Sequence, residues 1–252
     1  MRKVFMLLTA SVLFVSCKKN NDKAGTFKGA EQEVHKGKGW SWIKVDAQGT
    51  PLQLGIAISQ SALNTMPVGE QQQGGHQHSN SIILPLHPIA KTVTPFDHIQ
   101  LDWNPMGHPP FEIYGSAHFD FHFYMVPEAE VTGAVDMAKL NAVPAADYLP
   151  PAYFSGGPVP QMGTHFLDAT SREFNGQPFT ETFIYGTYNS RVTFYEPMIT
   201  LDFLKATSSY ERSIPQPAKF KAAGYYPTKM KIVKETGATN VILEGFVKRE
   251  GS

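Results

Sequence analysis

The feature that most constrains the fold of this chain is the segment from 117 to 126, which reads AHFDFHFYMV. Its residues alternate in character, and the side chains of a β-strand alternate between two faces, so the period of two predicts a strand. One face would carry His118, Asp120, His122 and Tyr124, and the other Phe119, Phe121, Phe123 and Met125. We expect both faces to be buried. The polar face then either lines a cavity or forms a hydrogen-bonded core network.

The composition of the whole chain agrees with a strand-rich fold. Its 252 residues include 19 Pro, 21 Gly and 12 % aromatic residues, as is typical of many strands joined by tight turns. We predict one mainly β domain, an antiparallel sandwich or barrel with one or two short helices. Basic and acidic residues number 22 each, so the chain lacks the net positive charge typical of a nucleic-acid-binding protein. We therefore expect no binding of nucleic acid.

The pattern of apolar residues and turn signals places the individual elements. Strands are expected over residues 40–46, 52–59, 81–86, 97–103, 179–188, 191–200, 225–234 and 239–248. Short helices are expected over 59–66 and 127–140. The proline-rich stretch 144–160 is predicted to be an irregular crossing segment.

The N-terminus resembles the leader of an exported lipoprotein. Arg2 and Lys3 precede an apolar run over 4–15 that is too short for a membrane span and ends in LFVSC, a sequence similar to a bacterial lipobox. We therefore predict a signal peptide over 1–16 and lipidation at Cys17, the only cysteine. The alternative is an ordinary secretion signal with an incidental cysteine.

This leader sets the expected organisation and location of the protein. Residues 17–38 are polar and are predicted to be a flexible tether, and residues 39–248 the β-rich domain. The expected location is the bacterial cell envelope, on the periplasmic or surface side, with the lipid anchor as the contact to the membrane.

The polar face of the central strand is a candidate metal site. Alternate strand residues lie about 6.5–7 Å apart on one face, so two neighbours among His118, Asp120 and His122 can converge on one ion. His165, in MGTHFLD, is the favoured further ligand. Imidazole and carboxylate ligands suit a divalent metal, with zinc or iron expected first. The alternative is a buried His–Asp–His network that orients the sheet.

Other titratable residues are candidates for supporting roles. Glu181 and Glu196 compete for the role of base or supporting carboxylate, although for Glu196 alone a solvent-facing edge position is favoured. His108, in WNPMGHPP, either overhangs the site as a proton shuttle or lid, or caps a backbone carbonyl. His76 and His78 lie in a Gln- and Gly-rich loop and are interpreted as exposed and incidental.

Four motifs in order, WNPMGH, HFDFHFYMV, MGTHFLD and FIYGTY with FYEPMIT, resemble the exported bacterial TTHB-type family, a domain of unknown function. The resemblance covers about 97–204 and implies a secreted or anchored β-rich domain, with no activity to transfer. A weaker likeness connects the alternating histidines to cupins and α-type carbonic anhydrases, which bind metals in this way.

Two functional hypotheses follow from the sequence. The first is a metal-dependent enzyme or metal-binding protein, in which bound water is activated for hydrolysis or hydration of a small molecule, or the metal binds oxygen. The second is a non-enzymatic surface or assembly lipoprotein whose polar strand face is structural. In that case the aromatic, proline-rich segment 148–160 is a candidate surface for a protein partner or for a second copy of the chain.

Overall fold

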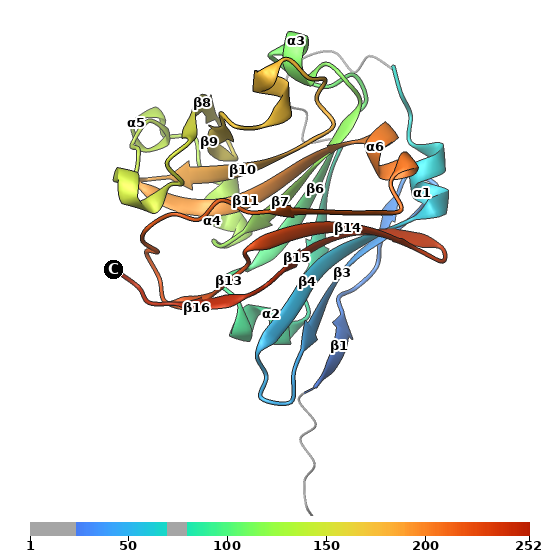
Figure 1. Ribbon diagram of the computed structural model, residues 1–252, viewed down its shortest axis with the longest axis horizontal. Helices are drawn as coiled ribbons and strands as arrows, with labels where there is room; N and C mark the ends of the chain where they lie inside the picture. Colours follow the sequence, from blue (N-terminus) through green and yellow to red (C-terminus); the bar gives the residue numbers. More distant parts are fainter. Residues whose placement is uncertain (1–23, 70–79) are drawn as a thin grey trace, which may run out of the picture.

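The computed structural model describes residues 24–69 and 80–252, and two antiparallel sheets packed face to face make up its main body (Figure 1). The expectations for the signal peptide, for Cys17 and for His76 and His78 lie outside the described residues.

The first sheet, called sheet A here, has the strand order β1-β3-β4-β15-β14-β12, with β2 also paired to β3. Its strands are β1 (Gly25–Lys28), β2 (Gln32–Val34), β3 (Gly37–Val45), β4 (Pro51–Ser59), β12 (Ser209–Ser213), β14 (Lys229–Glu235) and β15 (Ala238–Glu244). The expected terminal hairpin is present as β14 and β15, whose turn includes Gly237 at a φ of 88°, a conformation that favours glycine.

The second sheet, sheet B, has the order β5-β6-β7-β11-β10-β9-β8 and contains the central strand. Its strands are β5 (Ser81–Pro85), β6 (His98–Asn104), β7 (His118–Tyr124), β8 (Tyr153–Val159), β9 (Gly163–Asp168), β10 (Glu181–Tyr188) and β11 (Arg191–Thr200). The predicted hairpin of β10 and β11 turns through Asn189 and Ser190, both with positive φ, as two-residue hairpin turns require. Two further strands, β13 (Gly224–Tyr226) and β16 (Val247–Arg249), pair separately.

The predicted β class is confirmed, and the described residues show no closed barrel. The expectation of one or two helices was too low, because six short helices occur in the described part of the chain. They are α1 (Gln60–Thr65), α2 (Pro88–Val93), α3 (Phe111–Tyr114), α4 (Glu128–Thr132), α5 (Met137–Leu140) and α6 (Leu201–Ala206), besides the 3₁₀ turns η2 (Ala146–Tyr148) and η3 (Arg172–Asn175).

The helix expected over 127–140 is two separate helices. Gly133 ends α4, and the side chain of Asp136 accepts hydrogen bonds from Ala138 N and Lys139 N to start α5. The proline-rich stretch was also described wrongly, because its residues 153–159 form β8. This strand lies at the edge of sheet B, where Pro158 need not donate a ladder hydrogen bond.

The predicted tether also needs correction. Residues 25–28 and 32–34 form β1 and β2, which pair with β3, so this part of the predicted tether belongs to sheet A. Phe27 pairs with Ile43 and packs against the core, and this apolar contact holds a segment whose composition is otherwise polar. At the other end the chain stays attached beyond residue 248, through β16 and a bridge between Gly251 and Phe220.

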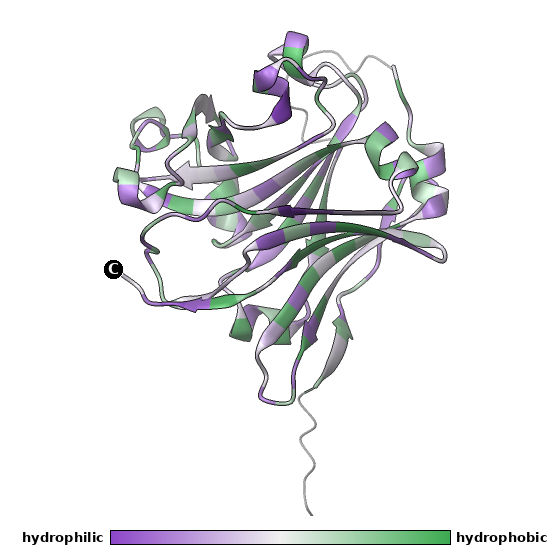
Figure 2. Ribbon diagram, in the orientation of Figure 1, coloured by the Kyte–Doolittle hydropathy of each residue, from purple (hydrophilic) through white to green (hydrophobic). Residues whose placement is uncertain are grey.

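The main core fills the space between the sheets. It joins residues of sheet A such as Ile43, Leu54 and Ile56 to the phenylalanines of β7 in one buried cluster. Hydrophobic and hydrophilic residues alternate along the strands in Figure 2, as is expected of a sandwich in which one face of each sheet packs on the core. The phenylalanine face of β7 therefore points into the sandwich, and its polar face points away from it.

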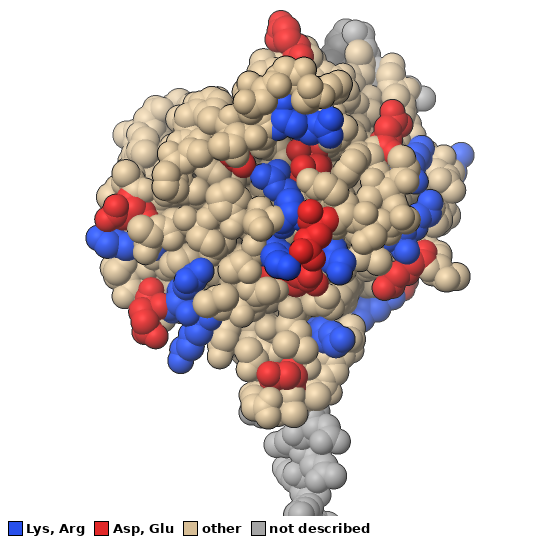
Figure 3. Space-filling view, viewed as in Figure 1, with Lys and Arg blue, Asp and Glu red and all other residues tan. Residues whose placement is uncertain are grey.

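The charged side chains on the face shown in Figure 3 are mixed in sign, with acidic and basic groups interspersed. Lys229 on β14 and Glu211 on β12, for example, form an ion pair of 2.8 Å. Within residues 24–69 and 80–252, none of the helices has the length and hydropathy needed to cross a membrane.

Candidate metal centre

The polar side chains of β7 continue across the outer face of sheet B onto the neighbouring strand β6. The register of the two strands sets polar residues side by side: Gln100 opposite His122, Asp102 opposite Asp120, and Asn104 opposite His118. All seven residues of β7 are buried, including those on this outer side. The exposed fractions are 0 % for His118 and His122, 2 % for Asp120 and 1 % for Glu196.

Three strands contribute one group of possible ligands, which we call the strand triad: His122 on β7, His165 on β9 and Glu196 on β11. Glu196 Oε2 lies 3.3 Å from His165 Nε2 and 3.6 Å from His122 Nε2. The carboxylate thus lies between two imidazoles that come from strands on either side of it.

A second group, the loop triad, consists of His108, His118 and Asp120. His118 Nε2 lies 3.2 Å from Asp120 Oδ1, and His108 Nε2 lies 3.8 Å from Asp120 Oδ2. His118 and Asp120 are on β7, whereas His108 comes from the loop between β6 and α3. The two imidazole rings meet edge to face, with centroids 4.7 Å apart.

The distances within each triad suit a shared cation. Zinc binds imidazole and carboxylate atoms at about 2.0–2.2 Å in a tetrahedron, so two of its ligand atoms lie about 3.3 Å apart. The separations in the triads are 3.2–3.8 Å, equal to this value or up to about half an ångström longer. Four of the atoms, His118 Nε2, Asp120 Oδ1, His122 Nε2 and Glu196 Oε2, are buried and make no hydrogen bond.

The opposite ring nitrogens of three of the histidines, His108, His118 and His122, each lie close to an oxygen atom. His122 Nδ1 lies 2.8 Å from Asp102 Oδ2, and His118 Nδ1 lies 2.7 Å from the carbonyl oxygen of Ser116. His108 Nδ1 is 2.9 Å from the carbonyl oxygen of Pro109. Metal-binding histidines commonly use this arrangement, in which one nitrogen is fixed by an oxygen and the other faces the ion.

Asp102 is itself fixed by two donors. Gln100 Nε2 donates to both of its carboxylate oxygens, at 3.0 and 3.1 Å, and the hydroxyl of Ser81 donates to Oδ1. Asp120 is fixed in the same way by Asn104 Nδ2, at 2.8 Å from Oδ2. Asp102 and Asp120 therefore have little freedom to move.

Burial and mutual attraction perturb the titration of these groups. Burial opposes the charged form of His122, but Glu196, Asp102 and Asp120 outweigh it and raise its pKa to about 9. Burial raises the pKa of Glu196 well above its usual value, against the attraction of His122. For Asp120 burial has the same direction, yet the three histidines nearby lower its pKa. The metal-free site therefore attracts positive charge, which a proton or a metal cation can supply.

Both triads border one cavity of about 70 Å³ on the outer side of sheet B. Its lining includes Asp120 and His108 from the loop triad, Glu196 and His165 from the strand triad, and Tyr114 from α3. The β8 backbone at Gly156 and Gly157 forms another part of the wall, beside a bulge in the β8–β9 pairing. A small molecule in this cavity would lie next to both triads.

A glycine on β10 makes room for the strand triad. Gly186 pairs with His165 on one side and with Phe194 on the other. A Cβ atom at Gly186 would lie 1.9 Å from the Phe194 ring, so no larger residue fits there without a shift. The Phe194 ring in turn packs edge-on against both His122 and His165, at 5.1 and 5.2 Å between centroids.

The structure brings the predicted ligands together but divides them differently. His118 and Asp120 group with His108, and His122 groups with His165 and Glu196. The expectation of a solvent-facing Glu196 is wrong, because this residue is fully enclosed between two histidines. For His108 the carbonyl contact is present at Nδ1 and Nε2 faces Asp120, while a role as proton shuttle or lid stays a prediction.

Glu181 was expected to act as a base at this site, and the structure places it elsewhere. Its side chain accepts a hydrogen bond from Tyr210 Oη at 2.6 Å and pairs with Arg212 at 3.0 Å. Arg212 also pairs with Asp168 at 3.0 Å. Glu181 thus belongs to an ion-pair network that links β10 with β12, and the metal centre lies on the other face of sheet B.

Two residues near the site were not identified from the sequence. Asp102 is one, although its strand reads HIQLDWN and alternates just as β7 does, so the same period-two argument would have placed it beside His122. Tyr114 is the other, and it lines the cavity from a helix of four residues that no pattern indicated. Burial, together with Glu173 and Glu196, raises the Tyr114 pKa.

The fold and the site together define a class: a two-sheet antiparallel β domain with two buried groups, each of two histidines and one carboxylate. Residues 46–103 match the TTHB210-like family model, described as "Hypothetical protein TTHB210". The predicted TTHB-type resemblance is thereby confirmed, but the match overlaps the range expected for it only at 97–103. It includes β4 to β6 and leaves out β7.

The other comparisons add no relative to this picture. No curated protein and no solved structure matches the chain significantly, so the expected likeness to cupins and α-type carbonic anhydrases is without support. The matching family description names no activity.

Proposed function

We propose that this protein is an exported, lipid-anchored metalloprotein in which the strand triad and the loop triad each bind one divalent cation, zinc or iron. Each triad offers two imidazoles and one carboxylate. This ligand set is found both in hydrolytic zinc sites and in non-haem iron sites that bind oxygen, and in both cases it leaves coordination positions open.

A single observation carries the proposal. In each triad a buried imidazole Nε2 atom faces a buried carboxylate oxygen at 3.2–3.6 Å, and neither atom makes a hydrogen bond. Leaving such groups buried and unsatisfied costs several kcal/mol, on the order of 2–7 for each polar group. A cation bound between them would satisfy all of these atoms at once.

The same observation weighs against the purely structural alternative. A network that only orients the sheet would direct a donor at each acceptor, as Gln100 and Ser81 do toward Asp102. Asp102, which contacts His122, and Asn104, which donates to Asp120, have their hydrogen-bond partners in this way. The atoms at the centre of the triads are not.

The residues around the cavity suit work on a small molecule. A bound divalent cation supplies a water of lowered pKa for hydrolysis or hydration, or a position for oxygen. Asp102 and the Ser116 carbonyl hold His122 and His118 with their Nε2 atoms toward the cation. Tyr114, whose pKa is raised, lines the cavity wall and donates its hydroxyl hydrogen to Glu173 Oε1 at 3.5 Å.

The lipid anchor rests on the leader sequence alone. The apolar run ending in LFVSC supports cleavage before Cys17 and attachment of acyl chains to it. Intact-mass measurement of the protein from its native host should show a chain that begins at Cys17 with added acyl mass. A Cys17→Ser variant should leave the membrane fraction, and an unprocessed residue 1 would contradict the proposal.

The metal centre is tested by metal content. Elemental analysis of protein purified without chelator should find two ions of zinc or iron per chain, and about one in a His122→Ala variant. His35→Asn is the matched control, because His35 is exposed in the turn between β2 and β3, belongs to neither triad, and has a φ of 50° that is compatible with Asn. A metal-free and chelator-insensitive native protein would leave the structural network as the better account.

A further inference from the structure

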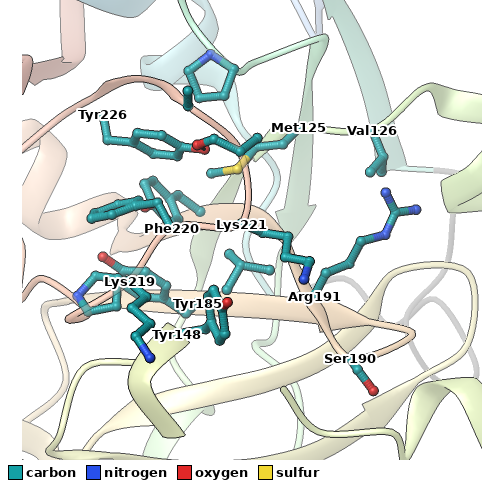
Figure 4. A pocket seen from close by; sticks show the side chains of 16 residues that line it. Met125, Val126, Tyr148, Tyr185, Ser190, Arg191, Lys219, Phe220, Lys221 and Tyr226 are labelled. Atoms are coloured by element: carbon teal, nitrogen blue, oxygen red, sulfur yellow. Dashed lines mark hydrogen bonds between the residues drawn. The ribbon is translucent and has the colours of Figure 1, made fainter. Parts of the chain in front are cut away.

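A second cavity, of about 240 Å³, lies at one end of the sandwich, on the core-facing side of sheet B and thus on the side opposite the metal centre (Figure 4). Tyr185 and Tyr195, which belong to the main core, contribute to its inner wall. The segment between β12 and β14 covers it from outside with Phe220 and Tyr226. Glu196 follows Tyr195 on β11, and its side chain points to the opposite face of sheet B. This cavity is therefore separate from the metal centre.

The walls of this cavity are aromatic and apolar. Phe220 and Tyr226 pack with ring centroids 4.4 Å apart, and Figure 4 shows them along one side, near Met125. The tyrosine hydroxyls are already used, since Tyr185 donates to the Pro215 carbonyl at 2.7 Å and Tyr226 to the Ala222 carbonyl at 3.0 Å. The rings therefore offer carbon surface to an occupant. The volume exceeds the roughly 150 Å³ of an apolar cavity known to admit benzene.

Three cations and no acidic residue are among the residues that line this cavity. Two are neutralised by carboxylates beyond the lining, because Lys219 pairs with Asp147 at 2.9 Å and Arg191 pairs with Glu130. Lys221 has no carboxylate partner among the described residues, and its ammonium group lies 5.6 Å from the ring centroid of Tyr148. Figure 4 shows Lys221 and Arg191 along the side opposite Phe220 and Tyr226.

From this combination we infer that the cavity binds a small aromatic carboxylate. The aromatic body would pack edge-to-face or offset against Phe220 and Tyr226, which is the favourable geometry for such rings. The carboxylate would lie at the mouth and accept a charge-assisted hydrogen bond from the Lys221 ammonium group. A neutral aromatic compound would gain the first contact only.

The test uses 4-phenylbutyrate as the probe and 4-phenylbutanamide as its neutral counterpart, both titrated by calorimetry. Chelator is present throughout, so that the carboxylate cannot bind a metal ion in the triads. Native protein should bind the carboxylate more tightly than the amide. Lys221→Met should weaken carboxylate binding about tenfold, the effect of losing one hydrogen bond to a charged group, and leave amide binding unchanged.

Lys219→Met is the matched control, because Lys219 is an exposed cation that already has a carboxylate partner. It should change the carboxylate affinity by less than about twofold, as is usual for an exposed ion pair. Ala222→Phe, an exposed lining position, should narrow the cavity and weaken both probes. Equal carboxylate binding by native and Lys221→Met protein, undiminished binding by Ala222→Phe, or no binding at millimolar probe would each overturn the inference.

Discussion

The two faces of β7 are equally buried, but their side chains differ in whether packing or hydrogen bonding offsets the cost of burial. On the inner face Phe119, Phe121 and Phe123 pack against other rings, for instance Phe96 and Phe123 at 5.8 Å between centroids. On the outer face the side chains are ionisable, and several of their atoms meet no hydrogen-bond partner. Burial stabilises the fold on the inner face and opposes it on the outer face. A strand with this contrast is built for a site as well as for a core.

The largest effect is expected from the inner face. Phe121→Ala should lower the free energy of unfolding by about 3–5 kcal/mol, because it removes a fully buried ring and leaves a cavity. Urea unfolding measures the loss. The metal content per folded chain should stay the same, and a loss of metal in the folded variant would show that the two faces are not independent.

The next effect concerns the outer face as a whole. Removing both ions with a chelator should cost about 3–4 kcal/mol in total if the free metal had been present at roughly 10 to 30 times the Kd of each triad, since only the folded state binds it. The thermal midpoint of the native protein should therefore fall on chelation, while His35→Asn behaves as the native protein does. If the midpoint does not move, the outer face is satisfied by something other than a metal.

The two triads are separated by a pair of single substitutions. Glu196→Gln should remove the ion of the strand triad, and His108→Ala that of the loop triad, so each variant should retain one ion per chain. We expect the midpoint to fall less in the His108 variant than in the Glu196 variant, because beyond its ion the first loses only a loop side chain and the second a group buried in a central strand. Metal analysis and calorimetry measure both, and loss of both ions in either variant would indicate one shared centre.

A smaller effect is expected for a residue that contacts a ligand but is not itself one. Asp102→Asn should weaken metal binding at the strand triad by about 10- to 100-fold, because the charge that fixes His122 is lost. The loop triad should keep its affinity, since its histidines are held by backbone carbonyls. Competition titration with a coloured chelator measures the two affinities, and an unchanged strand triad would remove Asp102 from the centre.

The last expected effect is a difference in pH dependence. His122 has a pKa of about 9 in the metal-free fold, above the usual 6.5 or so, which makes its protonation a source of stability. That contribution is complete below about pH 6.5 and is lost as the pH rises through about 9. The raised pKa of Glu196 acts in the same direction. The midpoint of chelated protein should therefore fall between pH 6.5 and 9.

The zinc-loaded protein should show the opposite trend between pH 5.5 and 7.5. Protonated imidazoles cannot bind a metal, so the ions are held more tightly as the pH rises and the thermal midpoint should increase. Differential scanning calorimetry of the two forms over the same buffers gives both slopes. Parallel slopes would mean that the metal does not replace the protons of the triads.

Much of the fold could be predicted because it depends on local patterns. The alternation in β7, the Asn189–Ser190 turn and the short helix after Ser59 each follow from a few neighbouring residues. The errors occurred where distant contacts decide the outcome. Residues 25–34 have the composition of a tether and became strands because Phe27 packs against the core.

The sequence by itself determined that one strand carries imidazoles and a carboxylate on one side and phenyl rings on the other, since the period of a strand is fixed by its backbone. Only the tertiary structure decided which distant residues complete each group. Glu196 and His165 reach His122 because β11 and β9 lie in the same sheet, with Gly186 leaving the space for Phe194 between them. Glu181 was excluded because strand pairing turned its side chain to the other face, where Arg212 pairs with it.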